Sequence, residues 1–174
     1  MNTMTDGPAT SLYTPILLRG GRTVRELMDL ELSKELKESL NHAPEGNCVS
    51  RGLPFTINAV HVGLSDEITI EADPFSAKWI VFMHTSDYIP LDESKDGFFS
   101  PMPGAGRLNE LAAEYVLVFD DGSESNLEIR RRHQIGAFQR GWGENCLQAV
   151  SHTKPAPGRA HHEQTTGSWG HSQT

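Results

Sequence analysis

Histidine is the residue type in this chain whose number and spacing come closest to a chemical site. Eight histidines are present, and four of them gather with a glutamate near the carboxyl end: His152, His161, His162, Glu163 and His171. Imidazole and carboxylate groups bind zinc, iron or manganese, and a divalent ion held in this way would activate water for hydrolysis. Adjacent His161 and His162, however, point in opposite directions along an extended chain, so they do not meet at one ion without a bend. We therefore expect a surface segment with incidental histidines, and His161, His162 and His171 stay as the candidates for a metal site.

His84 stands where an apolar run ends and a long segment rich in proline and glycine, residues 85–109, begins. Loops of this length are usually functional or disordered, and binding groups gather on loops that a sheet supports. We favour a structural role for His84, in which its ring nitrogens bond to backbone carbonyls. Ligand binding by His84, Asp87 and Tyr88 is the alternative. Ser86 completes the residue types of a catalytic triad, but neighbours on a strand point to alternate faces and no Gly-x-Ser-x-Gly motif is present, so no catalytic residue is predicted.

Two tryptophans have glycine neighbours, Trp142 between Gly141 and Gly143 and Trp169 before Gly170. An indole in such surroundings is often an exposed platform on which a sugar ring stacks while polar loop groups bond to its hydroxyls. The alternative is that both rings close one end of a sheet core. Both interpretations stay open, and Trp142 and Trp169 join the predicted ligand-binding residues.

Carboxylates crowd the same long segment and are the hard oxygen ligands that calcium prefers: Asp87, Asp92, Glu93, Asp96 and Glu110. They lack the EF-hand pattern, so we expect a solvated acidic loop. A structural calcium ion or another divalent metal is the alternative, and no cofactor is predicted. The basic run Arg130–His133 is expected to pair with this loop rather than with phosphate, because the formal net charge of the chain is -8.

The elements that would position these groups are mostly strands. Residues 115–130 predict two strands joined by an Asp-Gly turn, in which glycine accepts a positive φ. Alternating apolar and polar residues predict half-buried strands at 55–59 and 68–71. Trp79–Met83 is apolar at every position, which predicts a central strand covered on both faces with Trp79 in the core. A short edge strand is expected at Pro15–Leu18.

One helix is predicted over residues 23–40. Thr23 and Glu26 match a capping box, and the apolar stripe is Val24, Met28, Leu32, Leu36 and Leu40. We expect this stripe to pack on a sheet; binding of a partner protein is the alternative.

Strands joined by short turns with one long crossover favour a mostly β fold, an antiparallel β-sandwich of jelly-roll type with one amino-terminal amphipathic helix. The predicted organisation is a flexible leader over 1–14, the sandwich domain over 15–150 and an extended segment or linker over 151–174. The net charge of -8 argues against nucleic acid and anionic membranes as partners. The amino-terminal residues resemble no signal peptide, so we expect a cytoplasmic location in which Cys48 and Cys146 stay unlinked.

Four segments together resemble the accessory β-sandwich domains of large bacterial hydrolases: Gly52–Ile57, Phe82–Ser86, Tyr115–Arg130 and Gly141–Gly143. The similarity covers residues 50–145, and the helix departs from the usual all-strand form. The resemblance implies a galactose-binding-like or jelly-roll module beside a hydrolytic domain, and it assigns no functional residue here. It also implies that the sandwich continues beyond a stretch like Trp169–Thr174, so we expect either a fragment or an open sheet edge that favours dimer formation.

Three functions follow as hypotheses. The first is a non-catalytic module that binds a ligand, with saccharide as the expected class, or that has a structural role. The second is a metal-dependent hydrolase that uses His84 with the carboxyl-terminal histidines. The third is an assembly domain that contacts a hydrolase domain or a second copy through the helix stripe or a sheet edge.

Overall fold

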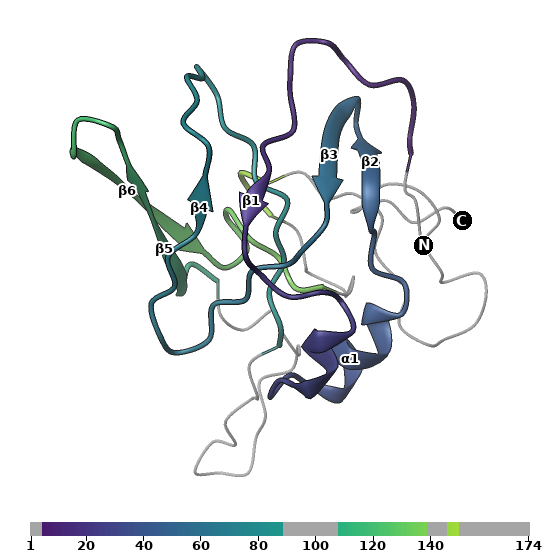
Figure 1. The fold of residues 1–174 in the computed structure, drawn as a ribbon. Coiled ribbons are helices and arrows are strands. Elements are labelled where there is room, and N and C mark those ends of the chain that lie inside the picture. The colour runs from purple at the N-terminus through teal and green to yellow at the C-terminus, as the bar shows by residue number, and fades with distance from the viewer. Residues whose placement is uncertain (1–4, 89–107, 139–145, 150–174) are drawn as a thin grey trace. The chain divides into compact units, whose positions relative to one another are not determined.

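The computed structural model describes residues 5–88, 108–138 and 146–149. The chain divides into two compact units, Met1–Ile80 and Val81–Thr174, whose elements are shown in Figure 1. The sandwich domain predicted over residues 15–150 therefore spans parts of both units.

The first unit contains a hairpin of β2 (Gly46–Ser50) and β3 (Leu53–Ile57). The strands are antiparallel, with Cys48 opposite Phe55. The turn is Arg51 and Gly52, which both have positive φ, 51° and 77°, as a two-residue turn between twisted strands requires. The Asp6 carboxylate accepts a hydrogen bond of 2.6 Å from the backbone N–H of Arg51. The strand predicted at 55–59 is thus confirmed as part of β3, which ends at Ile57. Its partner strand, β2, was not predicted.

The helical segment of this unit differs from the single helix predicted over 23–40. It consists of a 3₁₀ helix, η1 (Glu26–Asp29), and a separate α-helix, α1 (Lys34–Leu40). The capping box is confirmed, because the Thr23 N–H donates to the Glu26 carboxylate over 2.7 Å and the Glu26 N–H donates to the Thr23 hydroxyl over 3.3 Å. The bonds that the Glu26 carboxylate accepts from the backbone N–H and the hydroxyl of Thr23 lower the pKa of Glu26.

The interruption has a local cause. Leu30 is extended, with ψ 162°, and the Ser33 hydroxyl accepts a hydrogen bond of 3.0 Å from the Leu36 N–H, which starts a new helix. Ser33, within the predicted apolar stripe, therefore acts as the N-cap of α1. A repeat of apolar residues at every fourth position does not show that a cap interrupts the helix there.

The remaining pairing in the first unit is short. β1 (Leu18–Arg19) pairs antiparallel with β4 (Glu71–Ala72), and Arg19 forms an ion pair with Asp73. Arg22 and Val60 form a bridge with hydrogen bonds of 2.9 and 2.7 Å. The strands predicted at 15–18 and 68–71 are thus present only as these two-residue ladders, displaced toward their carboxyl ends.

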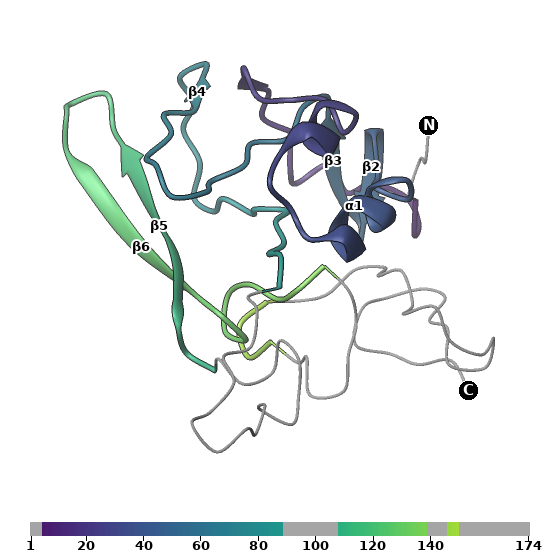
Figure 2. The ribbon, with the colours of Figure 1, turned by 90° about the horizontal axis from the view of Figure 1, so that it is seen from below.

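The second unit is built on a long hairpin of β5 (Leu111–Val118) and β6 (Glu124–Arg130), with Tyr115 opposite Leu127. Figure 2 shows its strong twist. In the turn, Gly122 has φ 80° and the Asp121 carboxylate accepts a hydrogen bond of 2.8 Å from the Ser123 N–H. The predicted hairpin and its Asp-Gly turn are confirmed.

The central strand predicted at Trp79–Met83 is wrong. The run has no regular structure, and its five side chains are 36–70% exposed. The boundary between the two units falls inside it. None of the two-stranded sheets among the described residues pairs with this run, and apolar composition alone does not supply a partner strand.

The described chain is thus mostly strand, in small antiparallel sheets with one α-helix. None of the helices in the described ranges is long and apolar enough to cross a membrane.

Candidate functional site

His84 lies half-buried in the second unit, with both ring nitrogens in hydrogen bonds. Nδ1 is 3.0 Å from the Tyr115 hydroxyl, and Nε2 is 2.9 Å from the backbone carbonyl oxygen of Gln134. A carbonyl oxygen only accepts, so we assign the proton of the neutral ring to Nε2 and let Nδ1 accept from the tyrosine. The imidazole therefore connects β5 with the turn that follows β6.

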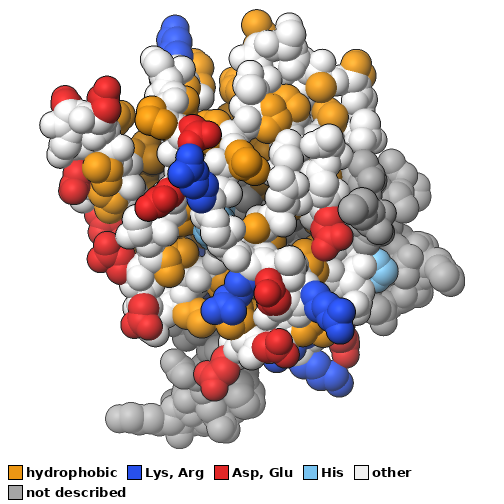
Figure 3. Space-filling view, in the orientation of Figure 1, with side chains coloured by type: hydrophobic (Ala, Val, Ile, Leu, Met, Phe, Trp, Pro, Cys, Tyr) orange, Lys and Arg blue, Asp and Glu red, His pale blue; other side chains and the backbone are white. Residues whose placement is uncertain are grey.

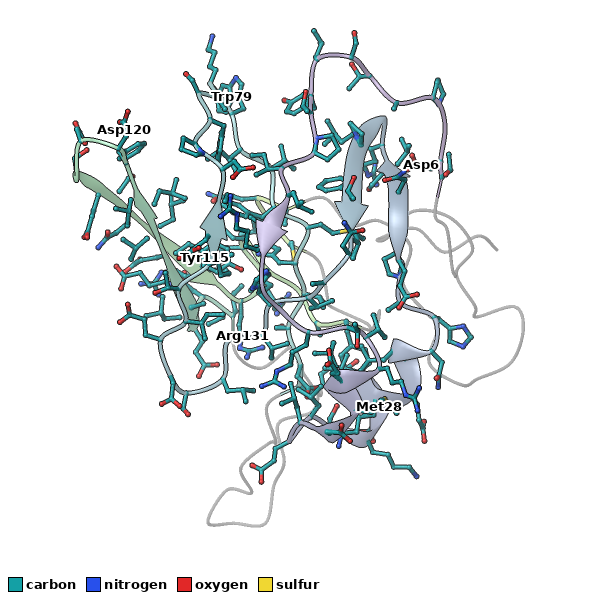
Figure 4. The ribbon with its side chains drawn as sticks, in the orientation of Figure 1. Asp6, Met28, Trp79, Tyr115, Asp120 and Arg131 are labelled. Atoms are coloured by element: carbon teal, nitrogen blue, oxygen red, sulfur yellow. The ribbon has the colours of Figure 1, made fainter. Side chains whose placement is uncertain are left out.

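Burial sets the protonation states of this pair. Desolvation lowers the pKa of His84, and the bond to the Gln134 carbonyl opposes that shift in part. Desolvation also raises the pKa of Tyr115. Both groups are therefore neutral near pH 7, which is the state that the two hydrogen bonds require. The ring of Tyr115, which is labelled in Figure 4, also contacts Phe82 edge to face, with ring centroids 5.2 Å apart.

The residues after His84 pair with a buried run, Ile135–Phe138. The Ser86 N–H donates to the Gly136 carbonyl and the Phe138 N–H donates to the Ser86 carbonyl, both over 3.0 Å. The rings of Tyr88 and Phe138 contact each other with centroids 4.9 Å apart. The segment that opens the long loop is thus held by a parallel bridge at Ser86.

Arg131 joins this segment to the base of the hairpin. Its Nη1 donates to the Ser86 hydroxyl and to the Asp87 carbonyl, each over 3.2 Å. Its Nε lies 3.7 Å from the Glu110 carboxylate. The expected pairing of the basic run with the acidic loop is therefore confirmed at Arg131 and Glu110. Arg130 instead pairs with Glu128 on its own strand, over 2.8 Å.

These contacts form a structural network rather than a nucleophile with its base. His84 bonds to Tyr115 and Gln134, whereas the Ser86 hydroxyl donates to the Gly136 carbonyl over 3.2 Å and accepts from Arg131. The favoured structural role predicted bonds from the His84 ring to backbone carbonyls; Nε2 has such a bond to Gln134, whereas Nδ1 bonds to the Tyr115 hydroxyl instead. A triad would require a direct bond between the imidazole and the hydroxyl.

Three of the predicted ligand-binding residues thus lie on one short segment, His84, Asp87 and Tyr88. Their role in binding stays a prediction. The Asp87 carboxylate accepts a hydrogen bond of 2.7 Å from the Tyr88 N–H. The other predicted residues lie outside the described ranges: Trp142, Trp169, His152, His161, His162 and His171, with the acidic Asp92, Glu93 and Asp96.

Within the described ranges no three His, Cys, Asp or Glu side chains are grouped to hold a metal ion. Both cysteines are free thiols, and Cys48 is buried.

Sequence reasoning missed Tyr115 and Gln134, the two partners of His84. Tyr115 was assigned only a place in a strand, and Gln134 bonds through its backbone, so its residue type carries no signal. A buried turn after the basic run was indicated in the sequence by three apolar residues, Ile135, Ala137 and Phe138.

The first unit exposes aromatic side chains in one short segment. Trp79 is 70% exposed and Phe75 is 49% exposed, and Asp73, Ser76 and Lys78 around them are exposed as well. Trp79 was expected in the core, so the structure corrects that expectation. Its label in Figure 4 marks this ring.

The first unit also has an open hollow of about 320 Å³ beside η1 and the end of α1, lined by Val24, Arg25, Met28, Leu40, Asn41, Ala43 and Glu45. A smaller hollow of about 210 Å³ shares Val24 and Glu45 with it. Part of the predicted helix stripe therefore faces these hollows.

Comparison of the chain with protein-family models, with curated proteins and with solved structures found no match.

Proposed function

We propose that this chain is a non-catalytic β module that binds a saccharide. The observation that carries the proposal is the exposure of the Trp79 indole, 70%, with Phe75 near it in the sequence. A flat aromatic face offers a sugar ring apolar contact, and an exposed indole is able to serve as a stacking platform for it.

Polar groups in the same segment support a sugar rather than a purely apolar ligand. Ser76 and Lys78 are exposed between Ala72 and Trp79, and so is Asp73, whose carboxylate pairs with Arg19. Carboxylate, hydroxyl and ammonium groups bond to sugar hydroxyls while the ring stacks, which is how such sites obtain specificity. The hydrogen bonds of His84 support the non-catalytic part, because the imidazole uses both nitrogens inside the fold.

A glycan array probed with the labelled full chain tests this function. We expect binding to a subset of glycans that is weakened roughly tenfold by Trp79→Ala, because the stacking contact is lost. Trp79→Tyr should retain part of the binding, since its ring still stacks.

Leu64→Ala is the matched control, because Leu64 is an exposed apolar side chain of the same unit, 61% exposed, without an aromatic face. Trp142→Ala and Trp169→Ala test the two platforms that the sequence predicted. A chain that binds no glycan on the array, or that binds equally well after all three tryptophan substitutions, would contradict the proposal.

We further propose that the two-stranded ladders are parts of a jelly-roll sandwich, as in the accessory domains of bacterial hydrolases that the sequence resembles. The mostly antiparallel pairing supports this arrangement. Nuclear Overhauser contacts between backbone protons of different hairpins should then be found in solution. Contacts confined to β1–β4, β2–β3 and β5–β6 would rule the sandwich out.

A further inference from the structure

β6 is an edge strand. It pairs with β5 in a sheet of two strands, and no third strand adjoins it among the described residues. An edge strand presents a row of backbone N–H and C=O groups that another extended chain can pair with.

The last residue of β6, Arg130, shows on which side of the strand the backbone N–H and C=O groups of each residue lie. The Arg130 N–H donates to the Gln134 side chain over 2.9 Å, and its carbonyl accepts from the backbone N–H groups of Gln134 and Ile135. These Arg130 groups thus point away from β5. Because ladder bonds alternate along a strand, those of Glu128, Asn126 and Glu124 point away from β5 as well.

The two faces of β6 differ in chemistry. Leu127 and Ile129 share one face with Tyr115 of β5, whereas Glu124, Asn126 and Glu128 share the other. Glu114 of β5 lies directly opposite Glu128 on that second face. Figure 3 shows acidic side chains gathered over this hairpin, at the left of the view.

Arg130 compensates only one of these carboxylates. It bonds to Glu128 through Nε over 2.9 Å, which leaves Glu114 and Glu124 on the face with no ion pair among the described residues. Asp120 and Asp121 add negative charge at the hairpin tip (Figure 4), and hydrogen bonds from Ser123 lower the pKa of Asp121. The edge therefore carries an excess of negative charge.

These charges argue against a second copy of the chain as the occupant. Antiparallel pairing of β6 with itself about Asn126 would place Glu124 opposite Glu128 twice, and like charges opposite each other destabilise a sheet. The formal net charge of -8 adds a repulsion between copies.

We propose that β6 is a docking edge for an extended, basic segment of another protein, in which Lys or Arg residues alternate with apolar ones. The segment adds a third strand beside β6. Its basic side chains lie on the face of Glu124 and Glu128, and its apolar side chains lie on the face of Leu127 and Ile129. This interaction does not depend on the saccharide function, which involves the segment of Phe75 and Trp79 in the other unit.

A fluorescein-labelled peptide of seven residues, lysine alternating with valine and both ends blocked, is the probe. We expect its fluorescence anisotropy to rise on titration with the full chain. Glu124→Lys should weaken binding roughly tenfold, because an attractive cross-strand pair becomes a repulsive one. Glu67→Lys is the matched control: it changes the net charge equally at an exposed site of the first unit, and it should have little effect.

Backbone pairing is tested separately by two further peptides, one N-methylated at every valine and one at every lysine. Only alternate residues of an added strand bond to the edge, so one of the two should lose binding and the other should keep it. Equal weakening by Glu124→Lys and Glu67→Lys would show only long-range attraction to an acidic chain. That result, equal binding of both methylated peptides, or no binding of the probe, would overturn the proposal.

Discussion

The two longer hairpins of this protein close their turns in different ways. The β2–β3 turn places Arg51, a residue with a Cβ atom, at φ 51°, and its N–H is bonded by the carboxylate of Asp6, which is 45 residues away in the sequence. The β5–β6 turn uses Gly122 for the positive φ, and Asp121 bonds two residues ahead to Ser123.

The difference shows that a hairpin turn can be stabilised by residues within the turn or by a residue far away in the sequence. The β5–β6 turn contains all the groups that stabilise it, so its geometry follows from four or five consecutive residues. The β2–β3 turn is completed only when the amino-terminal segment lies against it, where Asp6 also donates its N–H to the Val49 carbonyl over 3.2 Å. Formation of the first hairpin is therefore coupled to the ordering of that segment.

The largest effect is expected from Ile129→Ala. Ile129 is 5% exposed and is the buried apolar side chain of β5 and β6 among the described residues, so truncation should lower the free energy of unfolding of the second unit by about 3 kcal/mol. Urea unfolding monitored by amide hydrogen exchange measures the loss of stability in β5 and β6 separately from that in β2 and β3. Val118→Ala, at a side chain that is 69% exposed, should change stability by less than about 0.5 kcal/mol; similar effects of both substitutions would contradict this packing.

The second expected effect is a dependence of the second unit on pH through His84. Its folded-state pKa lies below the ordinary value of 6.5. Above pH 6.5 the ring is therefore neutral in both the folded and the unfolded state, and the contribution of its hydrogen bonds to stability is complete. As the pH falls below 6.5, the unfolded state binds a proton that the buried ring resists, and stability is lost until the folded-state pKa is passed.

Amide exchange in β5 and β6 between pH 7 and pH 5 measures this loss. His84→Gln keeps a polar side chain but does not titrate, so the dependence should become flatter in this variant. An unchanged profile would show that His84 is not the responsible group.

Gly122→Ala should destabilise the β5–β6 turn by roughly 1 kcal/mol, because an L-residue is strained at this φ. A Cβ atom at Gly122 would meet nothing within 4 Å, so the cost is conformational and not steric. Faster exchange of the Ser123 and Glu124 amides, with β2 and β3 unaffected, is the expected readout. If β2 and β3 lost protection to the same extent, the two hairpins would not be independent.

The smallest effect is expected from Asp6→Ala, a loss of about 1 kcal/mol or less for one hydrogen bond at an exposed site. Its diagnostic feature is location: the substitution should loosen the Arg51 turn although it lies 45 residues away. Hydrogen exchange at the Arg51 and Gly52 amides measures it. Asp121→Ala is the matched control, because it removes the corresponding local bond and should affect only β5 and β6.

Much of the local structure was predictable from residue types. The Asp-Gly turn identified the β5–β6 hairpin, and Thr23 with Glu26 identified a helix start, because glycine geometry and capping act over a few residues. The Arg131–Glu110 pair followed from the opposite charges of two segments. β2 was not predicted, because Gly46–Ser50 does not alternate between apolar and polar residues and its turn depends on Asp6, 45 residues away.

The role of His84 required the tertiary structure. The sequence left open whether this imidazole binds a ligand or bonds within the fold, and its partners, the Tyr115 hydroxyl and the Gln134 carbonyl, are 31 and 50 residues away. No spacing rule encodes contacts over such distances.

The sequence by itself determined a mostly β chain with a local hairpin, a capped helix start and an acidic character, because periodicity, turn chemistry and charge depend on near neighbours. Only the tertiary structure decided that Trp79–Met83 lies exposed outside any sheet and that His84 uses both nitrogens internally. An apolar run becomes a buried strand only when a distant segment pairs with it, and that pairing is a property of the folded chain.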